Sequence, residues 1–101
     1  MCYSLIGRLQ STAPYDNIKT IDIAEYFDAE NLEKAIVIAR ALLQSYKIKS
    51  DKGGNTINTL QAGLRDDIRQ VVWISCLTPK KVRLREEVVT PEYFYEEVIH
   101  P

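Results

Sequence analysis

Residues 29–47 constrain the fold of this chain most, because their apolar side chains recur at spacings of three and four. That spacing is typical of an amphipathic α-helix. The apolar stripe consists of Leu32, Ala35, Ile36, Ala39, Leu42, Leu43 and Tyr46. Val37, Ile38 and Ala41 widen the stripe beyond the single face that a surface helix buries. We therefore expect a helix, capped by Asp28, between a sheet and a second layer, which is either another helix or a second chain.

Three segments are predicted to form strands of that sheet. Residues 2–9 alternate with period two, and the set that shares one face is Tyr3, Leu5, Gly7 and Leu9. Residues 71–77 are rich in β-branched and aromatic side chains on both faces, which indicates a central strand with Trp73 in the core. The turn residues 78–80 then predict that residues 82–89 return beside this strand and complete a hairpin.

The remaining segments favour helices, with one choice left open. Residues 18–27 fit either a strand or a short helix capped by Asp22. Residues 57–69 favour a second amphipathic helix, because an apolar side chain recurs at every fourth residue from Leu60. A short final helix is expected over residues 91–99, since a capping threonine, a proline and a glutamate stand at its start.

Together these segments predict one α+β domain over residues 1–101. Its sheet is small, mainly antiparallel and of three to four strands, and it packs against a long central helix with one or two further helices. Hydrophobic residues make up 46% of the chain, which is enough for a single core. The longest apolar run, Ala35–Ala39, is too short to cross a membrane, and residues 1–10 lack the pattern of a secretory signal. We expect a cytoplasmic protein.

Few residues point to catalysis or to a metal. The chain has two cysteines and one histidine, His100, so a zinc site or a serine triad is hard to build. No catalytic, metal-binding or cofactor-binding residue is assigned. Cys76 is interpreted as a buried, inert thiol in its strand. Cys2 is the one candidate nucleophile, because removal of Met1 would leave a free α-amine beside its thiol.

Charge and aromatic residues indicate two candidate contact regions in the last quarter of the chain. The candidate contact residues are Lys80, Lys81, Arg83, Arg85, Tyr93 and Tyr95. Period two places three of the four cations on one strand face, where they could bind a phosphate backbone or an acidic protein. The two tyrosines stand beside glutamates in the final segment, a combination that is common at protein interfaces.

Three functions compete. The first is a non-catalytic protein-interaction module, such as a regulator, adaptor or inhibitor of viral or mobile-element origin, with a homodimer covering the second side of the long helix. The second is nucleic-acid binding, either through a winged-helix-like order of helices near residues 20–27 and 29–47 or through the basic hairpin as a β-ribbon. The third is an enzyme with Cys2 as its nucleophile. We prefer the first, because cofactor motifs and ligand clusters are missing from the sequence.

Overall fold

The computed structural model describes residues 1–12, 18–52, 56–79, 82–84, 87–89 and 92–99. For residues 51–52, 56–58, 78–79, 82–84, 87–89 and 92–94 the description covers the backbone path and the strand pairing.

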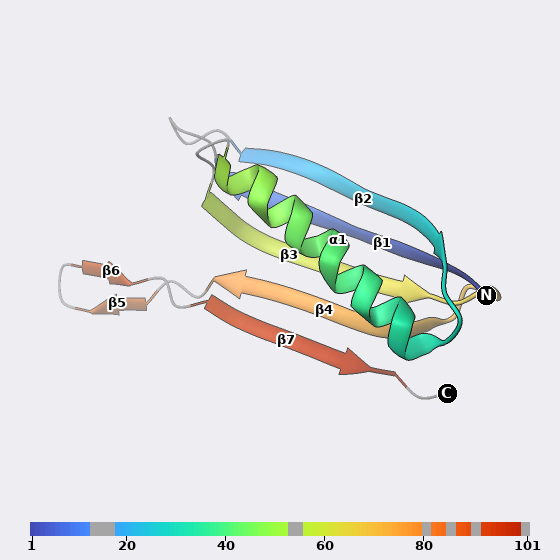
Figure 1. The fold of residues 1–101 in the computed structure, drawn as a ribbon. Helices are drawn as coiled ribbons and strands as arrows, with labels where there is room; N and C mark the ends of the chain where they lie inside the picture. The colour runs from blue at the N-terminus through green and yellow to red at the C-terminus, as the bar shows by residue number, and fades with distance from the viewer. Residues whose placement is uncertain (13–17, 53–55, 80–81, 85–86, 90–91, 100–101) are drawn as a thin grey trace.

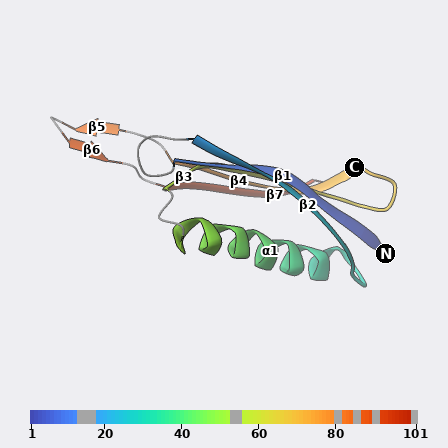
Figure 2. The same cartoon turned by 90° about the horizontal axis from the view of Figure 1, so that it is seen from above.

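The described chain forms a main antiparallel sheet with a single helix on one of its faces, and a separate two-stranded sheet (Figures 1 and 2). The sheet has five strands in the order β2-β1-β3-β4-β7, and β5 pairs only with β6. The strands are β1 Cys2–Thr12, β2 Ile18–Asp28, β3 Thr56–Arg65, β4 Val71–Pro79, β5 Val82–Leu84, β6 Glu87–Val89 and β7 Glu92–Val98. The prediction of an α+β chain with a mainly antiparallel sheet and a long helix is confirmed, but the sheet has five strands and not the predicted three to four.

The helix α1, Leu32–Lys52, connects the two neighbours of β1 and therefore crosses over that strand. It contacts β3 and β1. Its N-cap is Asn31, whose side-chain oxygen accepts a hydrogen bond from the Lys34 amide at 2.9 Å. The prediction of Asp28 as the cap was wrong, because Asp28 is still the last residue of β2 and its carboxylate accepts a hydrogen bond from Cys2.

The core lies between α1 and the strands beneath it. Its buried apolar residues are Tyr3, Leu5, Leu9, Ile23, Ala35, Ile36, Ala39, Leu43, Leu60, Ala62, Leu64, Trp73 and Leu77. The predicted helix stripe and the predicted core position of Trp73, which is 1% exposed, are therefore confirmed. Small residues let the helix lie close to the sheet, since Ala35 and Ala39 are fully buried and Gly7 pairs with Ala62.

Two predicted helices are strands. Residues 57–69 fall largely in β3, where Leu60 and Leu64 share the face under the helix. A spacing of four residues is a multiple of the strand period as well as close to one helical turn, so it did not distinguish the two. Residues 91–99 fall largely in β7, which pairs with β4 over seven positions. In the described part of the chain, α1 is the only helix.

The structure also decides between strand and helix for residues 18–27, and it corrects the hairpin predicted from residues 71–77 and 82–89. Residues 18–28 form β2, which pairs with β1 without interruption. The helix–helix order that a winged helix requires is therefore not present. The predicted returning strand over residues 82–89 does not lie beside β4: its described parts, β5 and β6, pair with each other beyond the end of the sheet (Figure 1). The strand beside β4 is β7.

Candidate functional site

The predicted contact residues are only partly described. Lys80, Lys81 and Arg85 lie outside the described residues. Arg83 stands in β5 opposite Val88, and Tyr93 stands in β7 opposite Thr78, but their side chains are not described. The predicted row of cations on one strand face therefore stays a prediction.

Tyr95 is the one predicted contact residue whose side chain is described. It is 37% exposed, and its hydroxyl donates a hydrogen bond to the carboxylate of Glu97. It pairs with Cys76 of β4, and Cys76 lines a hollow on the face of the sheet that α1 leaves uncovered. Because directly paired residues project to the same side of a sheet, Tyr95 belongs to this uncovered face.

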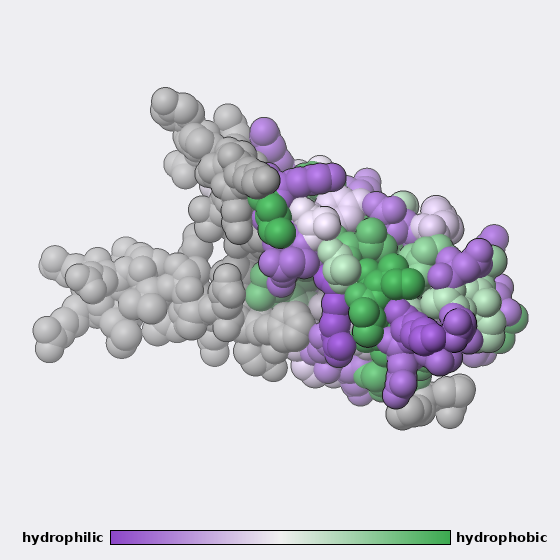
Figure 3. Space-filling view, in the orientation of Figure 1, coloured by the Kyte–Doolittle hydropathy of each residue, from purple (hydrophilic) through white to green (hydrophobic). Residues whose placement is uncertain are grey.

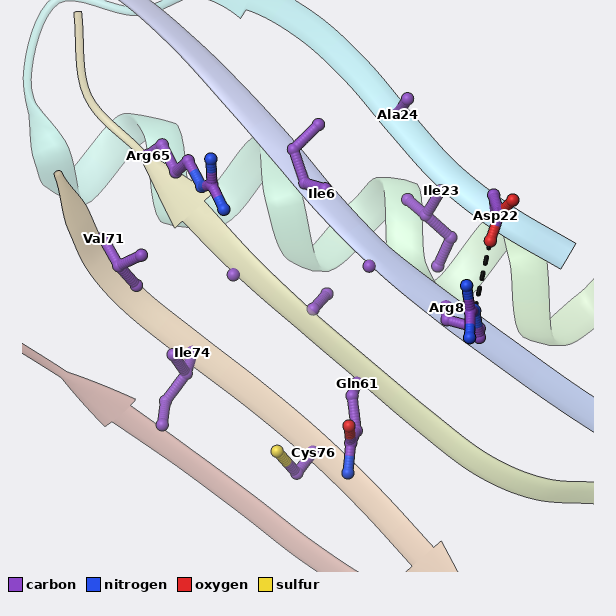
Figure 4. A pocket seen from close by; sticks show the side chains of 13 residues that line it. Ile6, Arg8, Asp22, Ile23, Ala24, Gln61, Arg65, Val71, Ile74 and Cys76 are labelled. Atoms are coloured by element: carbon purple, nitrogen blue, oxygen red, sulfur yellow. Dashed lines mark hydrogen bonds and ion pairs between the residues drawn. The ribbon is translucent and has the colours of Figure 1, made fainter. Parts of the chain in front are cut away.

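The uncovered face carries a broad, open hollow of about 820 Å³ over β2, β1, β3 and β4 (Figure 4). We call it the sheet hollow. Its apolar side chains are Ile6, Ala24, Val71, Ile74 and Cys76. Ile6 and Ile74 are half-buried without any helix over them. An antiparallel sheet with one solvated face ordinarily carries polar side chains there, so this apolar lining is the unusual feature of the face.

Gly63 deepens the sheet hollow at its centre. It pairs with Ile6 on one side and Ile74 on the other. A Cβ at this position would have only ordinary contacts, the nearest being the side chain of Val71 at 3.6 Å. Packing does not require glycine here, and the missing side chain leaves open space between the two isoleucines.

Polar groups surround the apolar centre. Arg8 and Asp22 form an ion pair at 3.2 Å at one end, close to Gln61, and Arg65 lies at the other end (Figure 4). Both members of the ion pair are well exposed, so water screens their attraction. An apolar centre within a polar rim is the arrangement found in protein–protein interfaces.

A second cluster of charged side chains lies on the helix side of the sheet. The Glu96 carboxylate accepts hydrogen bonds from Arg40 of α1 and, at 3.1 Å, from the indole nitrogen of Trp73. The hydrogen bonds from Arg40 hold the pKa of Glu96 below its usual value, although burial opposes that shift. Because all three groups satisfy one another, we interpret the cluster as the link that fastens β7 to the helix and the core.

The geometry around Cys2 argues against a nucleophile. The Cys2 thiol donates a hydrogen bond to the Asp28 carboxylate at 3.0 Å, and this bond, with the negative charge of Asp28, raises the pKa of the thiol. A reactive cysteine needs the opposite shift, because the thiolate is the attacking species. Cys76 is half-buried on the sheet hollow and not fully buried as predicted.

A second apolar patch lies on the outer side of α1 (Figure 3). Val37, Ala41 and Ile48 are exposed there, and Val37 is 61% exposed. The sequence predicted that a second layer covers this side, and within the described chain no element does so. The patch is narrow, because Lys34 and Gln44 are exposed beside it.

No group of three or more histidine, cysteine, aspartate or glutamate side chains within the described residues is arranged to hold a metal ion. Over the same residues, the one helix is not apolar enough along its length to traverse a lipid bilayer. No family model matches the chain, no curated protein matches it, and no solved structure matches its fold. The site must therefore be argued from its own geometry.

Sequence reasoning missed the sheet hollow as a candidate site. The sequence already showed apolar residues on the second face of two predicted strands. Ile6 lies between core residues in the strand over residues 2–9, and Ile74 does so in the strand over residues 71–77. Apolar residues on both faces of a strand normally indicate cover on both sides.

Proposed function

We propose that this chain is a non-catalytic protein-interaction module, a regulator, adaptor or inhibitor, whose partner docks on the sheet hollow. The observation that carries the proposal is the apolar centre of an otherwise solvated sheet face. Ile6 and Ile74 are only half-buried by the chain itself. A docked apolar surface would remove the rest of their contact with water. Burial of apolar area is the main favourable term in protein association.

The charge of the sheet hollow favours a protein partner over a nucleic acid. Arg8 is already paired with Asp22, which leaves Arg65 as the other cation of the lining. A nucleic-acid surface needs several cations to neutralise phosphates. We therefore expect a partner that presents apolar side chains to the centre and hydrogen-bonding groups to the rim.

The experiment is affinity capture from cells that express the chain, comparing two matched variants. Ile74→Lys places a charge in the sheet hollow, and Val37→Lys makes the same kind of change on the opposite, helix side. We expect Ile74→Lys to lose the captured protein and Val37→Lys to retain it, with both variants showing cooperative thermal unfolding. Retention by Ile74→Lys, or loss by Val37→Lys alone, would contradict the assignment of the surface.

A second candidate function is nucleic-acid binding through the β5–β6 hairpin. One observation favours it: β5 and β6 pair as a two-stranded ribbon beyond the sheet, and a ribbon of this kind fits the DNA major groove. Its test is fluorescence anisotropy with mixed-sequence DNA and RNA at several salt concentrations. Salt-dependent binding that is lost in the double variant Lys81→Glu, Arg83→Glu would support this function, whereas binding that is absent or unchanged would rule it out.

A further inference from the structure

Strand β2 is an edge strand with little of the usual protection against pairing, although it carries a charge, Glu25, on the helix side of the sheet. In the described chain its outer edge has no neighbouring strand. Its pairing with β1 runs over eleven positions without a bulge, and residues 18–28 contain no proline. Its single lysine, Lys19, stands near the beginning of the strand. Natural proteins block sheet edges with bulges, prolines and central lysines, because an open edge pairs readily with another chain.

Exposed apolar side chains lie along the same edge. Ile18 is 70% exposed, Ile21 is 40% exposed and Tyr26 is 77% exposed. The opposite edge of the sheet, β7, is shorter and more acidic, although Tyr95 and Val98 are partly exposed there. It has seven residues, and three of them are glutamates: Glu92, Glu96 and Glu97. Of the two edges, β2 is therefore the one suited to pairing.

We propose that β2 pairs antiparallel with β2 of a second copy of this chain, around a two-fold axis perpendicular to the sheet and centred on Ala24. The two sheets then join into one sheet of ten strands, with both helices on the same face. Main-chain hydrogen bonds across the new edge supply the attraction, as in other cases of strand addition.

The charges along β2 select this register. In a two-fold antiparallel pairing the centre falls on a residue that faces itself. A centre at Asp22 or at Glu25 would place two carboxylates opposite each other, which is unfavourable. A centre at Ile23 would place two apolar side chains opposite acids, since Ile21 would face Glu25 and Ile18 would face Asp28.

With Ala24 at the centre, one apolar side chain, Ile23, faces an acid, Glu25, and the other facing pairs are compatible. Ile21 stands opposite Phe27 of the partner, which pairs two apolar side chains on the helix side of the sheet. On the other side Asp22 stands opposite Tyr26 of the partner. No two acids face each other directly, and by symmetry each pair occurs twice.

The proposed dimer extends the surface that the proposed function uses but does not depend on that function. Ala24 lines the edge of the sheet hollow, so pairing at β2 brings the hollows of the two copies together on one face. A contact made mainly by one strand is smaller than a standard interface, and we expect it to dissociate on dilution.

Disulfide cross-linking tests the register. In a chain whose native cysteines are replaced by Cys2→Ser and Cys76→Ser, Ala24→Cys places two thiols across the axis. We expect mild oxidation to give a covalent dimer. The matched variant Thr20→Cys is the control, because its thiols would be separated by eight residues along the strand, about 26 Å. Equal cross-linking of the two variants would overturn the register.

Light scattering over a concentration series tests the edge itself. We expect the unmodified chain to dimerise at high concentration and Ile21→Lys to weaken dimerisation by about tenfold or more. Val37→Lys and Ile74→Lys should dimerise like the unmodified chain. A strict monomer at every concentration would overturn the proposal, as would a dimer that Val37→Lys or Ile74→Lys disrupts and Ile21→Lys does not. The Ile74→Lys result separates this proposal from the proposed function, whose capture experiment depends on that residue.

Discussion

Glu96 shows how one side chain can hold three elements together. Its carboxylate lies between Arg40 of α1 and Trp73 of β4, and it belongs itself to the edge strand β7. The side chain is only 17% exposed, whereas that of Arg40 is 58% exposed. We therefore attribute its contribution to the hydrogen bonds at the buried end more than to the solvent-screened charge of the arginine.

The lowered pKa of Glu96 predicts a loss of stability in acid. Because the folded-state pKa lies below the unfolded value, the contribution is complete above the unfolded pKa, about 4.3, and disappears as the pH falls through the folded value. We expect Glu96→Gln to be less stable than the unmodified chain at pH 7, by about 1 kcal/mol, and the difference to shrink below pH 4. Urea unfolding at several pH values measures this.

The matched control is Lys34→Gln, which removes a cation of the same helix from an exposed ion pair with Glu30. Its unfolding curve should follow the unmodified chain at every pH, since exposed pairs of this kind contribute little. A difference between Glu96→Gln and the unmodified chain that stays constant down to pH 2 would contradict the role of the charge.

At the scale of elements, β1 and β3 leave no room for a side chain at Gly7, which pairs with Ala62. A Cβ on Gly7 would lie 2.1 Å from the Gln61 carbonyl oxygen and 2.7 Å from the Ala62 Cα. Both are backbone atoms of the central sheet and cannot move without shifting a strand. We expect Gly7→Ala to cost about 1–3 kcal/mol, as overpacked sites do.

Gly63→Ala is the control for this prediction, because the added methyl group would have only ordinary contacts on the sheet hollow. Chemical unfolding of both variants gives the comparison. We expect Gly63→Ala to match or slightly exceed the unmodified chain in stability, since alanine restricts the unfolded chain more than glycine does. Equal destabilisation of the two variants would show that the close approach at Gly7 does not set the cost.

The elements that the sequence predicted correctly are those whose pattern allows one period only. Residues 29–47 have a seven-member stripe at helical spacing, and residues 2–9 and 71–77 alternate or are apolar throughout, so α1, β1 and β4 were predicted. The errors at β3 and β7 have a common cause. The local signals, a spacing of four residues from Leu60 and a proline-containing helix start before residue 92, fit a helix, and pairing with neighbouring strands overrode them.

Strand order and the candidate site could not be predicted from the sequence, for a different reason. Both depend on contacts between distant residues: β1 lies between β2 and β3 only because α1 crosses over it. The sheet hollow combines Ile6, Ala24 and Ile74, which come from three strands. The apolar residues themselves were visible in the sequence. What the sequence did not show is that one helix covers one face and leaves the other to solvent.

At the scale of the whole molecule, this one-sided arrangement predicts that the two faces of the sheet contribute unequally to stability. Leu64 is fully buried under α1, and Ile74 is half-buried on the sheet hollow one strand away. We expect Leu64→Ala to cost about 2–5 kcal/mol and Ile74→Ala about 1 kcal/mol, since part of its surface already meets water. The single tryptophan, Trp73, is buried in the core and reports unfolding by fluorescence.

Measuring the stability of these variants at several protein concentrations also tests whether the chain associates with itself. A chain whose uncovered face stays in solvent should show the same small cost for Ile74→Ala at every protein concentration. If a second copy covered that face, binding would stabilise the folded state by mass action, and the cost of Ile74→Ala would grow with concentration. Pairing at the β2 edge predicts instead that only edge variants such as Ile21→Lys change with concentration. If the loss of stability grew with protein concentration for Ile74→Ala and not for Ile21→Lys, the contact between the two copies would lie on the uncovered face and not at the β2 edge.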